Sequence, residues 1–294
     1  MRYLLAFAAL AWLAGCGAEA EFRRYGGDTM GTYYQVTARC PIDVGQQIET
    51  TLRQVNDEMS TYLPDSELSR FNSAPPGDWV PVSATLAEVV AAADLLSRES
   101  GGAFDVTVGP LVNLWGFGPD GAGAPPSDAA VADTLAGVGH RHLEVRRDPP
   151  ALHKTRALYV DLSAIAKGHG VDRVVTRLDE AGCADLLVDI GGEVRGRGSS
   201  PSGRPWRIGI EVPDPQQMGS VQRVIELEDA AVATSGDYRN FLEADGRRYS
   251  HTIDPRTGYP VEHTLASVSV VHGSAMWADG YATLLNVLGP EQGL

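Results

Sequence analysis

The feature of this chain that most restricts its fold is a mixture of helical and strand patterns without a regular strand–helix–strand repeat. Apolar residues recur every three or four positions at Ile48, Leu52, Val55 and Met59, and this spacing predicts an amphipathic helix. Residues 206–212 instead alternate polar and apolar side chains, as a half-buried strand does. We therefore predict an α+β fold with mainly antiparallel sheets and packed helices.

The remaining pattern supplies further elements of both kinds. Thr85 and Glu88 form a capping box that predicts the start of a second helix, and Gly101 ends it. A third helix is predicted from about Ile165 to Ala181, and residues 119–127, rich in Gly and Pro, are expected to form a surface loop. Strands are predicted at residues 23–38, with breaks at Gly26-Gly27 and Met30-Gly31, and at residues 157–162, 185–194, 221–233 and 265–271.

Length and charge limit the class of protein. With 294 residues, 43% of them hydrophobic, the chain can form one large domain or two small lobes with a proper core. Its net charge of −14 argues against nucleic acid, and against an anionic membrane surface, as the main partner. An anionic ligand would need local help from a metal ion or a few basic groups.

The first residues have the composition of an export signal. Arg2 precedes an apolar stretch, residues 4–13, that is too short to span a bilayer, and Leu13-Ala14-Gly15-Cys16 resembles a bacterial lipobox. We expect residues 1–15 to be a lipoprotein signal peptide and acyl chains on Cys16 to anchor the rest to a bacterial membrane, facing the periplasm or the cell exterior. A plain secretory signal is the alternative. Export would permit a disulfide between Cys40 and Cys183, but we expect two unpaired, inert thiols.

Residues 161–170 predict a ligand site at the start of a helix. A strand that ends at Asp161 and turns through Ser163-Ala164 leaves carbonyls that can ligate a hard cation and N–H groups that can meet phosphate. Lys167 would lie on the first turns of the helix, facing the turn. The alternative is an N-capped surface helix with a solvated lysine.

Two further positions offer chemistry. Asp279 and Thr283 are four residues apart in a segment of helix formers, so their oxygens share one face and suit Mg²⁺, which accepts few protein ligands. His251 precedes the turn at residues 254–258 and could act as a base or a phosphate partner. The alternatives are a solvent-facing pair on an amphipathic helix and a structural histidine.

Two glycine-bearing stretches are weaker candidates. Residues 101–105 could grip a nucleoside, and residues 189–193 allow close approach of the backbone to a planar ligand; each could equally be a plain turn or bulge. The chain has neither a G-x-G-x-x-G nor a Walker A sequence, so a dinucleotide site cannot rest on a Rossmann or P-loop cradle.

These segments together resemble the ApbE family, the FAD:protein FMN transferases. The resemblance implies a T-fold-like α+β architecture with two lobes, and an enzyme that uses Mg²⁺ to transfer FMN from FAD to a threonine hydroxyl of a target protein through a phosphoester bond, releasing AMP. It covers nearly the whole mature chain, in order: MGT at 30–32, MSTY at 59–62, GGAFD at 101–105, NLWGFG at 113–118, DLSAIAKG at 161–168, DIGGE at 189–193, TSGDY at 234–238, SHTIDPRTG at 250–258 and ADGYAT at 278–283.

The resemblance also implies roles for particular residues. His251 matches the histidine linked to activity and is our first choice to accept the hydroxyl proton, with Asp279 second. The Mg²⁺ ligands would be the Ala164 carbonyl, Asp279 and Thr283. The implied FAD contacts are Met30, Tyr62, Ala103, Phe104, Asp105, Asp161, Lys167 and Thr252.

The chain departs from the family pattern at two places. His169 stands where many relatives have Tyr, and the chain ends at Leu294, where relatives usually add a final strand-rich segment. We therefore expect residues 16–294 to form an ApbE-like domain that lacks this segment.

Two other functions fit the same residues: an Mg²⁺-dependent FAD pyrophosphatase that gives FMN and AMP, and a non-catalytic FAD-binding lipoprotein. The partners implied for a transferase are flavin-accepting subunits of membrane redox complexes, such as sodium-pumping NADH:quinone reductase or related electron-transport complexes.

Overall fold

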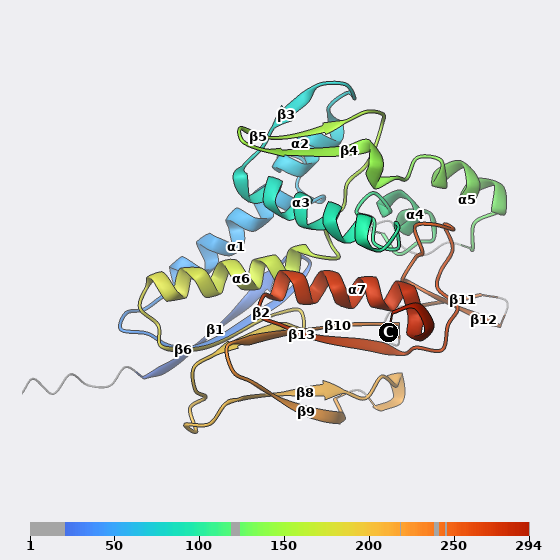
Figure 1. Ribbon diagram of the computed structural model, residues 1–294. Helices are drawn as coiled ribbons and strands as arrows, with labels where there is room; N and C mark the ends of the chain where they lie inside the picture. The colour runs from blue at the N-terminus through green and yellow to red at the C-terminus, as the bar shows by residue number, and fades with distance from the viewer. Residues whose placement is uncertain (1–20, 119–123, 218, 238–240, 245, 294) are drawn as a thin grey trace, which may run out of the picture.

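A six-stranded sheet is the largest layer of the computed structural model, which describes residues 21–118, 124–217, 219–237, 241–244 and 246–293 (Figure 1). Its order is β1-β2-β6-β7-β10-β13, and each neighbouring pair is antiparallel. This sheet confirms the predicted α+β class with mainly antiparallel strands. The strands are β1 (Phe22–Thr29), β2 (Thr32–Arg39), β6 (Asp185–Ile190), β7 (Glu193–Arg197), β10 (Ala230–Gly236) and β13 (Ser267–His272).

Helices α6 (Ala166–Glu180) and α7 (Ala275–Gln292) lie against one face of this sheet, and the hairpin β8 (Trp206–Glu211) and β9 (Val221–Leu227) lies below the other (Figure 1). A second lobe lies beyond α6 and α7. Two apolar cores correspond to the lobes, one centred on the sheet with α6 and one on α3 with the start of α6 and part of α7. The second lobe comprises α1 (Gly45–Met59), α2 (Glu67–Ser73), β3 (Trp79–Pro81), α3 (Ala84–Glu99), α4 (Gly109–Leu114), α5 (Asp128–Leu135), β4 (Leu143–Arg147) and β5 (Pro150–Lys154).

Four short elements complete the described chain. The hairpin of β11 (Phe241–Ala244) and β12 (Arg247–Ser250) lies near the C-terminal end of α7 (Figure 1). Single 3-10 turns occur at His140–His142 and Pro215–Gln217. Among the described residues, no helix is both long and apolar enough to cross a membrane.

The closest approach of two helices occurs where α6 crosses the start of α7. A Cβ atom on Gly168 would lie 2.1 Å from the carbonyl oxygen of Ala275, so only glycine allows the two backbones to touch. The Gly168 N–H donates to the Asp279 carboxylate at 2.9 Å. From the next turn of α6, the Asp172 carboxylate accepts hydrogen bonds from the Ala275 and Met276 N–H groups, both at 3.0 Å. These contacts fix the N-terminal half of α7 on α6.

One predicted strand is wrong. Residues 157–162 pair with none of the described strands, because the Asn72 side chain and one backbone carbonyl satisfy Val160 and Asp161 instead. The Asn72 amide donates to the Val160 carbonyl and accepts from its N–H, both at 2.8 Å, and the Asp161 N–H donates to the Val106 carbonyl at 2.7 Å. The alternating pattern reflects the burial of Leu158, Val160 and Leu162 and not a strand ladder.

Turns divide three predicted strands differently from the prediction. Gly26-Gly27 lies inside β1, and only Met30-Gly31, with positive φ at both residues, interrupts residues 23–38. The predicted strand at residues 185–194 is a hairpin that turns at Gly191-Gly192. The predicted strand at residues 221–233 is divided by Asp229, which has a φ of 49°.

The predicted helices near residues 48–59 and 165–181 are confirmed, but the predicted capping box is wrong. The N-cap of α3 is Ser83, whose side chain accepts from the Leu86 N–H at 3.1 Å, and Thr85 lies inside the helix. Gly101, with a φ of 61°, follows the helix end as expected.

The expectation of unpaired thiols is also wrong, because Cys40 and Cys183 form a disulfide. Strands β2 and β6 are neighbours, with Arg39 opposite Asp185, so the residue after β2 lies beside the residue two before β6. The proposed signal peptide, Cys16 and residues 119–123 of the predicted loop lie outside the described residues.

The close crossing of α6 and α7 predicts whether replacing Gly168 by alanine raises or lowers the free energy of unfolding. Helix propensity alone would make Gly168→Ala stabilising by ~1 kcal/mol. The new methyl group would meet the Ala275 carbonyl, and overpacking of this kind typically costs ~1–3 kcal/mol. We therefore expect a lower free energy of unfolding in urea. Gly273→Ala, where no atom lies within 4 Å of the added Cβ, should be neutral or slightly stabilising. A Gly168→Ala protein as stable as Gly273→Ala would contradict the close crossing.

Candidate functional site

A cavity of about 510 Å³ lies where the two lobes meet, and most of the predicted site residues line it. They come from the loops before α2, α4 and α6, from α6 and α7 themselves, and from the residues that follow β12. Those that line it are Tyr62, Ala103, Phe104, Asp105, Asp161, Ala164, Lys167, His251, Thr252, Asp279 and Thr283. Met30 lines an adjoining cavity of about 1160 Å³, which shares Tyr62, Asp161 and Lys167 with the first. The fold therefore brings together residues that are up to 253 positions apart (283 − 30).

The Lys167 ammonium group is the positive centre of the cavity. It donates to the Ser163 carbonyl at 3.3 Å and lies 3.7 Å from a Glu193 carboxylate oxygen and 3.8 Å from an Asp279 carboxylate oxygen. Burial lowers the pKa of Lys167, but the charges of Asp279 and Glu193 outweigh this effect, so its pKa is raised and the ammonium form is stabilised.

Glu193 and Asp279 are both buried, with 5% and 4% of their surface exposed. Burial raises the pKa of Glu193 to about 8 and also raises the pKa of Asp279, while the Lys167 charge acts in the opposite direction. One ammonium group thus faces two carboxyl groups in a low-dielectric site, and a further cation would favour the ionised form of both acids.

The predicted Mg²⁺ ligands are a set of hard oxygens from the turn before α6 and from α7. The Gly168 N–H donates to Asp279, and no hydrogen bond from a described residue reaches the Ala164 carbonyl four positions earlier. The Thr283 hydroxyl lies 3.3 Å from the Ser235 hydroxyl. A carboxylate, a freed carbonyl and a hydroxyl fit Mg²⁺, which completes its shell with phosphate and water. Among the described residues, no group of three or more His, Cys, Asp or Glu side chains is arranged so that it could hold a metal ion.

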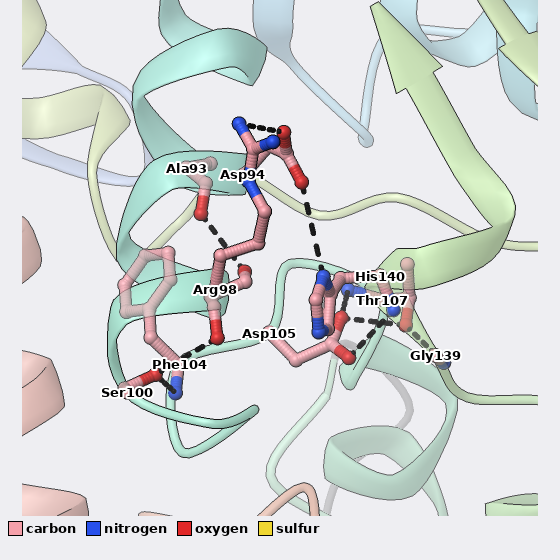
Figure 2. A network of polar contacts seen from close by, with 10 residues as sticks. Ala93, Asp94, Arg98, Ser100, Phe104, Asp105, Thr107, Gly139 and His140 are labelled. Carbon is pink, nitrogen blue, oxygen red and sulfur yellow. Dashed lines mark hydrogen bonds and ion pairs between the residues drawn. The ribbon is translucent and has the colours of Figure 1, made fainter.

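The Asp105 carboxylate is held by Thr107 of its own loop and by the backbone of His140 (Figure 2). One oxygen accepts from the Thr107 N–H at 2.8 Å and from the Thr107 hydroxyl at 2.7 Å, and the other accepts from the His140 N–H at 2.8 Å. The His140 ring in turn lies 3.8 Å from Asp94 on α3. These hydrogen bonds fix the turn that presents Ala103 and Phe104 to the cavity. In this structure Asp105 therefore positions the loop.

Asp161 lies on the rim shared by the two cavities. One of its carboxylate oxygens accepts from the Ser163 N–H at 2.9 Å and from the Ser163 hydroxyl at 2.5 Å, which tightens the turn before α6. Tyr62 lies on the same rim with 69% of its surface exposed, so its ring is available to a ligand.

His251 and Thr252 approach the cavity from the side of β12. The His251 ring packs edge to face on Phe117, with ring centroids 6.2 Å apart. The Thr252 hydroxyl accepts from the Asn286 amide of α7 at 3.0 Å. The Gly258 N–H donates to the Asp254 carbonyl at 2.8 Å, which confirms the predicted turn after His251.

Glu193 is the main site residue that our interpretation of the sequence did not single out. It begins β7 directly after Gly191-Gly192 and lines the cavity. The sequence signal that could have identified it is a charged residue that directly follows two glycines and directly precedes the apolar strand residue Val194. Ser235 and Gly236, at the end of β10, also line the cavity and belong to the TSGDY motif.

A family model described as the ApbE family matches residues 30–294. The chain belongs to the ApbE family. A relative from Vibrio cholerae, named FAD:protein FMN transferase, is 46% identical, with 100% of this chain and 89% of that protein covered. A second, from Escherichia coli K12 and of the same name, is 38% identical and covers 90% of this chain and 78% of its own length.

Solved structures agree with this assignment. The Vibrio cholerae flavin transferase ApbE superposes with a TM-score of 0.85 at 46% identity, covering 93% of this chain and 89% of that one. The apo form of the Pseudomonas stutzeri flavinyl transferase ApbE gives a TM-score of 0.84 at 43% identity, covering 94% and 87%. The predicted family and fold are confirmed, and the individual ApbE site roles stay predictions.

His169, two residues after Lys167 on α6, predicts how the stability of the protein changes as the pH falls. Burial lowers its pKa to about 4, and the Arg173 charge acts in the same direction. The folded pKa is below the ordinary value near 6.5, so the unfolded chain binds the proton first and stability is lost as pH falls from about 6.5 to 4. We expect the free energy of unfolding to fall by up to ~3 kcal/mol across this range. In His169→Tyr this part of the slope should vanish in pH-dependent urea titrations, and an unchanged slope would contradict the assignment.

Proposed function

We propose that this enzyme transfers FMN from FAD to a threonine hydroxyl of a target protein in an Mg²⁺-dependent reaction. Its ApbE relatives carry the name FAD:protein FMN transferase, which supports FMN transfer from FAD as the activity. The observation that carries the proposal is the convergence of Lys167, Asp279 and the freed Ala164 carbonyl on one cavity between the lobes.

The shape of the site suits a ligand with two ends. FAD joins a flavin and an adenosine through a pyrophosphate, and two cavities meet at a rim that includes Asp161 and Lys167. We place the pyrophosphate at this rim, where the Lys167 ammonium can pair with phosphoryl oxygens. The exposed Tyr62 ring, on the same rim, offers an aromatic face to one end of the ligand.

Asp279, Thr283 and the Ala164 carbonyl would hold the Mg²⁺ ion. A bound Mg²⁺ neutralises charge on phosphoryl oxygens and so favours attack at phosphorus. The chain itself contributes Lys167, whose charge stabilises the departing phosphate, and the α6–α7 crossing, which holds the Asp279 carboxylate in one orientation.

The reaction forms one bond and breaks one. The threonine oxygen of the target bonds to the FMN phosphorus, the bond from that phosphorus to the AMP oxygen breaks, and AMP leaves with the bonding electrons. The hydroxyl proton passes to a base, for which His251 is the first candidate and Asp279 the second. An imidazole is half deprotonated near neutral pH, which favours His251.

The N-terminal sequence supports a proposal for the location of the enzyme and for its target proteins. We propose that the lipid on Cys16 anchors the enzyme to a bacterial membrane, facing the periplasm or the cell exterior. Its targets would be flavin-accepting subunits of membrane redox complexes, such as sodium-pumping NADH:quinone reductase or related complexes.

Mass spectrometry of a threonine-bearing acceptor protein tests the proposal against both alternatives. After incubation with enzyme, FAD and Mg²⁺, we expect a covalent FMN adduct on the acceptor and one AMP for each adduct. Free FMN and AMP without an adduct would support a pyrophosphatase, and intact FAD bound to the enzyme would support a carrier.

The same assay tests the metal assignment. Asp279→Asn keeps an oxygen for the Gly168 N–H but removes the charge, so we expect a folded enzyme whose transfer falls on the order of a hundredfold or more. The matched control is Asp133→Asn, at an exposed position of α5, which should leave transfer unchanged. Undiminished transfer by Asp279→Asn would show that the carboxylate does not hold the ion.

A further inference from the structure

A groove on the outer side of the sheet has an unusual charge for this protein. Its volume is about 850 Å³, and it lies between β1, β2 and the residues that lead into β8. Three exposed arginines, Arg24, Arg204 and Arg207, line it together with Gln35, Thr37 and Ser202. None of the described residues that line it is acidic, whereas carboxylates line both cavities of the flavin site and the groove beside α3. We call this the arginine groove.

The three arginines form no ion pair among the described residues. Nearby arginines do: Arg23 pairs with Asp43 and Arg39 pairs with Asp185. Arg207 lies across the ladder from Glu226, but no ion pair joins them. In a chain with a net charge of −14, three unpaired cations around one concave surface leave a local positive potential for an external anion.

The groove also lies beside the first strand of the described chain. The Phe22 ring, at the start of β1, packs edge to face on Trp206 of the groove wall, with centroids 6.1 Å apart. Cys16 precedes Phe22 by six residues, and a chain of six residues spans at most about 20 Å. A lipid on Cys16 therefore holds the arginine groove close to the bilayer.

We infer that the arginine groove docks the domain on an anionic phospholipid surface. The inference rests on the proposed lipid anchor, which supplies most of the affinity, while the groove sets the orientation. The net charge predicts repulsion of the whole domain from such a surface, but charges beyond about 10 Å are screened at physiological salt. The acidic surface of the domain therefore faces away from the bilayer, and the arginine groove faces toward it.

This orientation keeps the 510 Å³ cavity of the flavin site open, whereas the adjoining cavity shares Gly26 with the arginine groove. The flavin-site cavity is lined by α7 and by loops of the second lobe, on the helix-covered face of the sheet, and the arginine groove lies on the side of β8 (Figure 1). Docking through the groove would leave the cavity facing away from the lipid, toward acceptor domains that extend from the membrane.

Two triple variants of the full chain test the inference. The first is Arg24→Gln, Arg204→Gln and Arg207→Gln; the control is Arg70→Gln, Arg141→Gln and Arg147→Gln, at exposed positions of the second lobe. Each removes three positive charges, so the net charges are equal. Flotation measures binding to phosphatidylcholine vesicles with and without phosphatidylglycerol. The quantity compared is the ratio of binding with phosphatidylglycerol to binding without it. One arginine near an anionic surface raises binding to that surface about fivefold. We therefore expect this ratio to be on the order of a hundredfold lower in the groove variant than in the control.

Each outcome has a definite meaning. Equal ratios for the two triple variants would overturn the inference. Displacement by inorganic phosphate at constant ionic strength would also overturn it, because it would mark a pocket for a small anion. Weaker FMN transfer to a soluble acceptor, with an unchanged vesicle ratio, would assign the groove to an acidic protein partner instead. Cys16→Ser should reduce binding to both vesicle types by the same factor. If it does not, the lipid anchor is refuted. The FMN-transfer assay does not depend on the anchor, so the proposed activity would still stand.

Discussion

The contact between the backbones of α6 and α7 at Gly168 is the constraint on which the site depends. Because no side chain separates the helices there, the Gly168 N–H reaches the Asp279 carboxylate, and the Ala164 carbonyl is left without that partner. The Asp172 carboxylate caps α7 one turn further along and fixes its register. The same short crossing thus orients the carboxylate, frees the carbonyl and places Lys167 beside both.

This arrangement has an electrostatic cost that a ligand can offset. Asp279 and Glu193 are buried beside one ammonium group at 3.8 and 3.7 Å, and burial raises the pKa of both acids. Partly compensated buried charge is typical of a site that is completed by its ligands. A divalent ion and a pyrophosphate would add opposite charges to the same small volume, so each would stabilise the other.

Sequence predicted those parts of the site that depend on local spacing. The i, i+4 pair of Asp279 and Thr283 and the position of Lys167 after a turn follow from helical geometry alone. The disulfide depended on the pairing of β2 with β6, which has no local signal. The position of Glu193 depended on the hairpin at Gly191-Gly192, which has a local glycine signal but whose approach to the cavity is set by the tertiary fold. The segment at residues 157–162 has the apolar pattern of a strand, but the Asn72 side chain, 88 positions away, satisfies Val160 instead.

The central claim is that oxygens from α7 and from the turn before α6 hold one divalent ion beside Lys167. Anomalous diffraction from crystals grown with FAD and Mn²⁺ in place of Mg²⁺ tests it most directly. The account predicts one strong peak within about 2.1 Å of the Asp279 carboxylate, with the Thr283 hydroxyl and the Ala164 carbonyl in the same coordination shell. A peak on other residues, or bound FAD with no peak between these three groups, would contradict it.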